Sequence, residues 1–108
     1  MTNPLPVAAL KQWLDDPVRA APFILDVREP WEYEICRIPG AQSLPMQEIP
    51  ARFRELPQDG DVVVVCHHGM RSLQVANYLA AAGFNRVYNL SGGVAAWAEQ
   101  IDPAMRNY

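Results

Sequence analysis

The chain has 108 residues, of which 50% are apolar and 19% charged, and its net charge is -3. This composition is typical of a globular domain and excludes a disordered chain. The acidic balance argues against a general nucleic-acid binder, which carries an excess of basic residues. No apolar run approaches the ~18 residues of a membrane-spanning helix. By length we expect one domain over residues 1–108.

Two further features concern the cellular compartment. The first residues, MTNPLPVAALKQWLDD, lack a basic segment followed by a clean apolar segment, so the sequence predicts no secretory signal. Two cysteines cannot build a disulfide framework, and a reactive thiol suits a reducing compartment. We therefore expect a cytoplasmic protein that binds neither membrane nor nucleic acid directly.

The first half of the chain begins with a helix and continues with short elements. Apolar residues at helical spacing predict the helix, and a short apolar run after Pro22 predicts a buried strand. A proline that can open a helix follows, and then a turn and a weak strand. The expected elements are a helix over Pro6–Asp15, a strand over Phe23–Val27, a helix over Pro30–Ile35 and a strand over Gln42–Leu44.

The second half alternates helices and strands more clearly. Four consecutive valines, Val62 to Val65, predict a central strand that is buried on both faces. Strands that alternate with helices predict an α/β fold, with a mostly parallel sheet and helices on both faces. The expected elements are helices over Met46–Leu56, Leu73–Ala82 and Val94–Gln100 and strands over Val62–Cys66 and Arg86–Leu90.

Cys66 lies at the carboxyl end of the valine strand, where open α/β sheets bind their ligands. A loop containing Gly69 follows, and Ser72 is a good N-cap for the next helix. The helix N-terminus favours a thiolate, and loop N–H groups can form a cradle for an anion. Arg71 adds a permanent positive charge. This pattern predicts a nucleophilic cysteine, whereas a cysteine alone is more often a small packed side chain.

Two stretches of the sequence resemble the single-domain rhodanese, or sulfurtransferase, family. VVVVCHHGMRSLQVANYLAAAGFNRVYNLSGGVAAW is similar to the catalytic half of such a domain, and LDVREPWEYEICRIPGAQSLP is similar to its upstream signature. The resemblance runs from about Leu5 to Trp97 and implies a recognisable core over about residues 5–100. It also implies a three-layer fold with a central, mostly parallel five-stranded sheet flanked by helices.

The resemblance implies a sulfurtransferase in which Cys66 takes a sulfane sulfur from a donor such as thiosulfate. The resulting persulfide passes its outer sulfur to a thiophilic acceptor, such as cyanide or a thiol. No cofactor or metal is expected, and the partners are a small sulfur donor and a possible protein donor or acceptor. A first alternative is a sulfur carrier that exchanges sulfur only with a protein partner.

A second alternative is a cysteine phosphatase or arsenate reductase. Those enzymes resemble this chain in fold but place five residues between the cysteine and the arginine, whereas four separate Cys66 from Arg71. The shorter loop predicts a smaller cradle, matched to one sulfur atom better than to a phosphoryl group. The expected substrate-binding loop comprises His67, His68, Gly69, Met70, Arg71 and Ser72. The two histidines could add positive charge or move a proton, or could point partly to solvent.

Asp26 and Arg28 end the strand that we expect beside the valine strand. The resemblance implies that they support the active loop, and the simpler alternative is a surface ion pair. Cys36 stands where family members commonly have glycine, so it could resolve a persulfide on Cys66 or could be a packed thiol. Gly92 and Gly93 are interpreted as a turn outside the site, and Trp13, Trp31 and Trp97 as core or rim residues.

Overall fold

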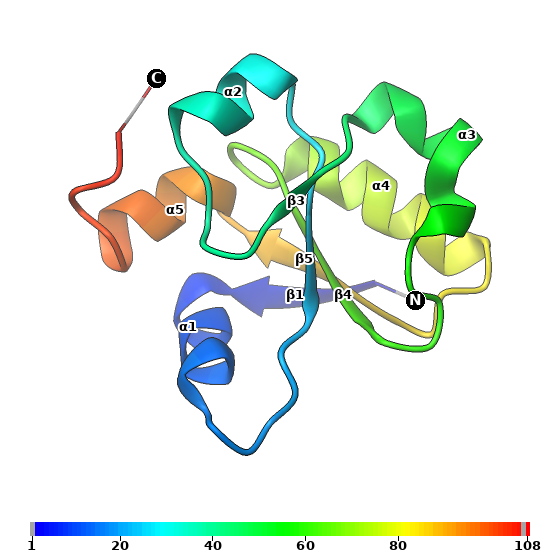
Figure 1. The fold of residues 1–108 in the computed structure, drawn as a ribbon, viewed down its shortest axis with the longest axis horizontal. Coiled ribbons are helices and arrows are strands. Elements are labelled where there is room, and N and C mark those ends of the chain that lie inside the picture. The colour runs from blue at the N-terminus through cyan, green and yellow to red at the C-terminus, as the bar shows by residue number, and fades with distance from the viewer. Residues whose placement is uncertain (1, 107) are drawn as a thin grey trace.

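A computed structural model describes residues 2–106 and residue 108, and its centre is a sheet of five strands (Figure 1). The order across the sheet is β1-β5-β4-β2-β3, and every neighbouring pair is parallel. The predicted α/β fold with a parallel sheet is therefore confirmed. The strands are β1 (Thr2–Pro6), β2 (Phe23–Asp26), β3 (Gln42–Ser43), β4 (Asp61–Val65) and β5 (Arg86–Ser91).

Helices cover both faces of the sheet, as the sequence predicts. They are α1 (Val7–Asp15), α2 (Pro30–Ile35), α3 (Ile49–Arg52), α4 (Met70–Ala81) and α5 (Gly93–Gln100). Helices α1 and α5 pack on one face, and α3 and α4 pack on the other (Figure 1). Among the described residues no helix is long and apolar enough to cross a membrane.

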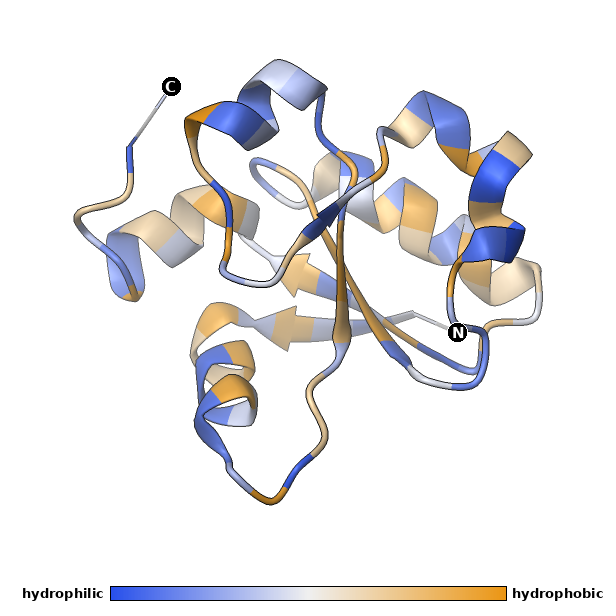
Figure 2. Ribbon diagram, in the orientation of Figure 1, coloured by the Kyte–Doolittle hydropathy of each residue, from blue (hydrophilic) through white to orange (hydrophobic). Residues whose placement is uncertain are grey.

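The valine strand β4 divides the core into two clusters. Val62 and Val64 pack toward α4, whereas Val63 and Val65 pack toward α1 and α5. Successive side chains of a strand point to opposite faces, so a strand covered on both faces has no polar position left. The apolar colour of the central strands in Figure 2 shows this continuous hydrophobic run. All four valines are fully buried, which anchors the residue that follows them.

Two elements differ from the sequence-based expectation. Strand β1, which the sequence analysis did not predict, pairs with β5 and lies at the edge of the sheet. Its two prolines lack an N–H group, and an edge strand tolerates them because one side needs no partner. The helix expected over residues 46–56 is three short pieces, with α3 between the 3₁₀ turns Met46–Glu48 and Phe53–Glu55.

The start of α4 is a correction that bears on the site. The helix begins at Met70 and not at Leu73, and its N-cap is Gly69, with a left-handed φ of 102°. The prediction that Ser72 caps this helix is therefore wrong. Glycine adopts the left-handed conformation without the steric cost that a Cβ brings, so the loop can end there. Ser72 then lies inside the first turn, where its hydroxyl is available to the cysteine.

Candidate active site

Cys66 is the first residue after β4 and is buried. Its sulfur lies against the first turn of α4, where the N–H of Gly69 donates a hydrogen bond to Sγ over 3.0 Å. A backbone donor in this position is charge-assisted when the sulfur is a thiolate, and the twelve-residue helix adds its dipole. The structure therefore brings the cysteine to a helix N-terminus, as the sequence predicts.

The Cys66 sulfur is one member of a closed ring of hydrogen bonds. The Cys66 thiol donates to Ser72 Oγ over 3.3 Å, and the Ser72 hydroxyl donates to Asn89 Oδ1. Asn89 Nδ2 donates to the carbonyl oxygen of Gly69 over 3.1 Å. The N–H of Gly69 donates to the sulfur, which closes the ring. The Ser72 proton can turn to Sγ when the thiol loses its own proton. Asn89 was not expected in the site from the sequence, although a buried asparagine within an apolar strand signals a polar partner.

Helix α5 holds the other side of the loop. Val94 N–H donates to the carbonyl oxygen of Cys66 over 2.9 Å, and Ala95 N–H donates to that of His67 over 3.0 Å. Gly93 brings the helix this close, because a Cβ there would overlap the same two carbonyl oxygens. The interpretation of Gly92 and Gly93 as a helix-entry turn is confirmed, since Gly92 is the N-cap of α5, but Gly93 also contacts the loop after Cys66, which the sequence did not predict. The tertiary contact, and not only the turn, requires glycine.

Arg71 does not point a free charge at the sulfur. Its guanidinium binds both carboxylate oxygens of Glu32 on α2, over 2.8 and 3.0 Å. Hydrogen bonds from Arg71 lower the pKa of Glu32 to about 2, so the pair stays charged at neutral pH. Because the negative charge of Glu32 compensates Arg71, the expected permanent positive field at the loop is weaker than the sequence predicts. Glu32 is 4% exposed, and the sequence suggested it only as a possible surface partner of Arg28.

The two histidines are stacked on each other, with ring centroids 4.2 Å apart. Burial and the charge of His68 lower the pKa of His67, which favours the neutral form of its ring. It therefore adds little positive charge to the loop. His68 is exposed, and Met70 is exposed to 72%. The loop residues gather around the cysteine as expected, but their side chains differ widely in burial.

Arg28 is fully buried beside Asp26, so the alternative of a surface ion pair is wrong. Their closest contact is 2.6 Å, between Arg28 Nη2 and Asp26 Oδ2. Arg28 also donates to the carbonyl oxygen of Cys36 over 2.6 Å and to that of Glu32 over 3.3 Å. These bonds tie the end of β2 to α2, which in turn carries Glu32. Arg28 therefore reaches the active loop through α2 and not by direct contact.

Cys36 is a packed thiol at the end of α2 and is 8% exposed. Its sulfur lies 3.8 Å from Arg28 Nη1 and belongs to the core cluster under α1 and α5, whereas Cys66 belongs to the other cluster. Trp13 and Trp97 are core residues, and Trp31 is 58% exposed and packs edge-on against Tyr108. The structure therefore does not bring Cys36 and Cys66 into one hydrogen-bonded group.

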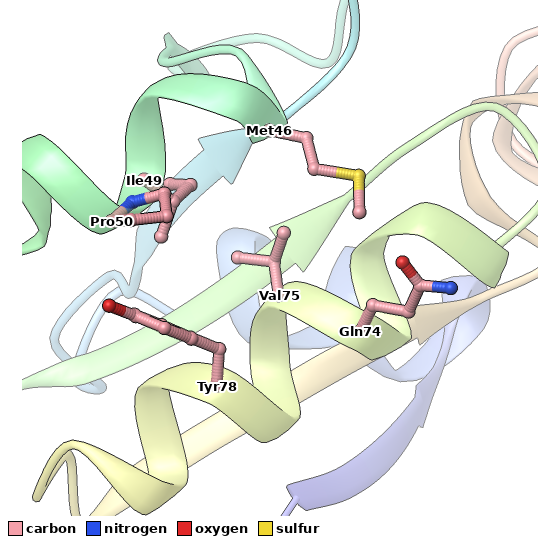
Figure 3. Close-up of a pocket in the computed structure, with 6 residues that line it drawn as sticks. All are labelled: Met46, Ile49, Pro50, Gln74, Val75 and Tyr78. Atoms are coloured by element: carbon pink, nitrogen blue, oxygen red, sulfur yellow. The ribbon is translucent and has the colours of Figure 1, made fainter.

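A separate apolar hollow lies between α3 and α4 (Figure 3). Met46 and Val75 point toward each other across it, and Tyr78 lines its far end. None of the loop residues from Cys66 to Arg71 lines it. The chemistry and this hollow are therefore different features of the molecule.

A strand-end cysteine held by a helix N-terminus defines a class of cysteine-centred α/β domains. Comparison with known proteins identifies the family within this class. Residues 7–100 match the rhodanese-like domain. The chain therefore belongs to the rhodanese-like family, which includes sulfurtransferases.

Individual relatives agree with this assignment. A sulfurtransferase of Allochromatium vinosum is 43% identical over 98 residues, covering 91% of this chain and 90% of that protein. The thiosulfate sulfurtransferase GlpE of Pseudoalteromonas translucida is 39% identical over 74 residues, covering 68% of this chain and 70% of that protein. Several other matched proteins are longer, and the chain spans only 25% or 30% of their length.

Solved structures confirm the fold. The rhodanese-like domain protein of Staphylococcus aureus superposes with a TM-score of 0.80 at 32% sequence identity. The match covers 88% of this chain and 90% of that one. The predicted five-stranded sheet and the predicted family are therefore both confirmed.

Proposed function

We propose that the protein transfers a sulfane sulfur from thiosulfate to a thiophilic acceptor through a persulfide on Cys66. The observation that carries this proposal is the sulfur of Cys66 at the N-terminus of α4, where Gly69 N–H and Ser72 both reach it. A thiolate in that position is stabilised by the backbone donor and by the helix dipole. Similarity to sulfurtransferases supports the same chemistry.

The reaction consists of two displacements. In the first, the Cys66 thiolate attacks the outer sulfur of thiosulfate, a new S–S bond forms, and sulfite leaves with the electron pair of the broken bond. In the second, cyanide attacks the outer sulfur of the persulfide, thiocyanate forms, and Cys66 returns as a thiolate. A thiolate acceptor follows the same course and becomes a persulfide. Because the two substrates react in turn, we expect ping-pong kinetics.

An anionic donor must be held without a free guanidinium, since Glu32 compensates Arg71. The backbone donors of the loop and the α4 dipole therefore supply most of the attraction. The donor contacts the side chains of the loop, which include His67, His68 and Met70. Asp26 and Arg28 support the loop indirectly, because Arg28 bonds both to Asp26 and to the carbonyl oxygen of Cys36. The spacing of four residues between Cys66 and Arg71 favours a sulfur atom over a phosphoryl group.

The test is intact-protein mass spectrometry after incubation with thiosulfate. Wild type and Cys36→Ser should gain one sulfur atom, and Cys66→Ala should gain none. Cys36→Ser is the matched control, because it removes the other buried thiol of the chain. Loading that survives in Cys66→Ala would contradict the assignment of the nucleophile. Loading in none of the three proteins would contradict thiosulfate as the donor.

The turnover rate distinguishes the two sulfur-handling alternatives. A sulfurtransferase should release thiocyanate repeatedly when cyanide is added, whereas a sulfur carrier would load once and turn over slowly. A phosphatase would instead hydrolyse an aryl phosphate, and we expect no such hydrolysis. A cytoplasmic location and a protein sulfur partner remain part of this proposal, and both suit a thiol that must stay reduced.

A further inference from the structure

The Tyr108 hydroxyl lies between the two ion pairs next to the active loop. It donates to Glu32 Oε2 over 2.8 Å and accepts from Arg28 Nη1 over 3.0 Å. Arg28 is paired with Asp26, and Glu32 is paired with Arg71. One phenol group therefore links a buried ion pair behind the site to the ion pair at the mouth of the site.

The ring of Tyr108 lies on the active loop itself. Its centroid is 4.2 Å from that of His67, the residue that follows the cysteine, and 5.6 Å from that of Trp31. The side chain is partly exposed, so it covers one side of the loop without closing the site. Burial raises the pKa of Tyr108 to about 12, and the hydroxyl therefore keeps its proton over the whole working range of a thiolate enzyme.

We propose that Tyr108 is a positioning residue for the sulfur-transfer site, which sets the placement and the effective charge of Arg71 through Glu32. This inference rests on the proposed function, because it concerns how an anionic sulfur donor is attracted to Cys66. Tyr108 does not touch the reacting sulfur in this arrangement. It acts through the carboxylate that holds the loop arginine.

The bonding of Glu32 explains the direction of the effect. Oε1 accepts from Arg71 and from the N–H of Glu29, whereas Oε2 accepts from Arg71 and from Tyr108. Without the phenol, Arg71 is the only one of these donors left on Oε2. The carboxylate then carries more uncompensated negative charge, and it draws the guanidinium toward itself. Both changes lower the positive potential at Cys66.

The experiment compares Tyr108→Phe with wild type and with Tyr78→Phe. Phenylalanine keeps the ring on His67 and removes only the hydroxyl. Tyr78 is a matched control, because it is a half-exposed tyrosine in the apolar hollow of Figure 3 and its ring packs on Phe53. The first readout is the ratio of the Cys66 alkylation rates with iodoacetate, an anion, and iodoacetamide, a neutral reagent. The second is the dependence of sulfur loading on thiosulfate concentration.

For Tyr108→Phe we expect the iodoacetate to iodoacetamide ratio to fall about three- to ten-fold, the range of one ordinary hydrogen bond, because the lost bond acts on Cys66 only through Glu32 and Arg71. The thiosulfate concentration for half-maximal loading should rise by a similar factor, with the maximal loading rate nearly unchanged. Tyr78→Phe should match wild type. A merely structural role for Tyr108 would slow both alkylating reagents equally and leave their ratio unchanged.

An unchanged ratio in Tyr108→Phe, with folding intact by circular dichroism, would overturn the inference. So would a fall in the maximal loading rate without a change in the half-maximal concentration. The proposed function can fail separately, since wild-type protein that never loads sulfur refutes thiosulfate transfer. In that case the alkylation ratio still tests whether Tyr108 controls the potential at Cys66.

Discussion

Arg71 and Glu32 form a two-bond ion pair at the mouth of the site, although 39 residues separate them in the chain. Arg71 belongs to the first turn of α4, and Glu32 belongs to α2, which follows the neighbouring strand β2. A bidentate guanidinium–carboxylate contact fixes orientation as well as distance. The pair therefore ties the loop after Cys66 to the helix opposite it.

The first prediction concerns the charge balance of this pair. Arg71→Ala leaves the carboxylate of Glu32 without its main partner, and that negative charge repels thiosulfate, which is a dianion. We expect sulfur loading to slow at least about ten-fold, the factor that corresponds to roughly 1.4 kcal/mol. The double variant Glu32→Gln with Arg71→Ala removes both charges, and it should recover part of the loss. Initial rates of sulfur loading, measured by mass spectrometry, test whether the double variant is faster than Arg71→Ala. A double variant slower than Arg71→Ala alone would show that charge balance does not set the rate.

The second prediction concerns acid stability. The folded-state pKa of Glu32 is about 2, below its ordinary value of 4.5, so the stability that it contributes is present above pH 4.5 and is lost as the pH falls toward 2. The linked free energy is roughly 3 kcal/mol. Glu32→Gln should have a smaller free energy of unfolding than wild type at pH 6. Between pH 4.5 and 2 its free energy of unfolding should fall by less than that of wild type. Urea titrations at several pH values measure this difference. Glu34→Gln, at an exposed position of the same helix, is the control and should follow wild type.

The third prediction concerns the ring of hydrogen bonds around the sulfur. Ser72→Ala removes the hydroxyl that reaches Cys66 and leaves Asn89 Oδ1 without that donor. We expect a loss of about 1–3 kcal/mol in the free energy of unfolding, because the amide oxygen is buried. Alkylation of Cys66 by iodoacetamide at pH 7 should also slow, since the thiolate has lost a donor. Ser43→Ala, at an exposed position on β3, is the control. If Cys66 is alkylated in Ser72→Ala as fast as in wild type, the Ser72 hydroxyl does not stabilise the thiolate and Gly69 is sufficient.

The fourth prediction concerns Gly93. Gly93→Ala places a Cβ on the carbonyl oxygens of Cys66 and His67, so the active loop must move. Gly40→Ala is the matched control, because both glycines have a left-handed φ, of 60° and 85°, but nothing lies within 4 Å of a Cβ at Gly40. The free energy of unfolding of Gly40→Ala should fall by about 1–2 kcal/mol, because backbone strain is the only cost there. Gly93→Ala should lose clearly more and should also load sulfur slowly. Thermal unfolding and loading rates measure both effects, and equal losses would show that the loop adapts to the methyl group.

Local patterns in the chain were sufficient to predict much of the architecture. The four valines of β4 have no polar position, so they predict a strand covered on both faces. The short helix α2 starts at Pro30, where a proline can open a helix, and it has the predicted bounds. Strand β1 was missed because its prolines and its short apolar content carry no strand pattern. Its parallel pairing with β5 makes it a strand.

The candidate site was predicted around the loop but not in its partners. The sequence indicated Cys66 and the loop up to Ser72, because a cysteine, a glycine and an arginine follow a buried strand within six residues. It did not indicate Glu32 or Tyr108 as residues of the site, because only tertiary contacts bring their side chains to the loop.

 In chain terms Tyr108 lies 76 residues from Glu32, and only the folded chain brings the two side chains within hydrogen-bond distance.

The amino-acid sequence by itself determined the α/β class, the order of most elements, the family and the cysteine with its loop. These depend on short-range patterns, since burial on both faces and the spacing of a loop are written in consecutive residues. Only the tertiary structure decided how the charges around Cys66 are compensated. Asp26, Arg28, Glu32 and Arg71 come from three segments, and Coulomb forces depend on distance in space and not along the chain.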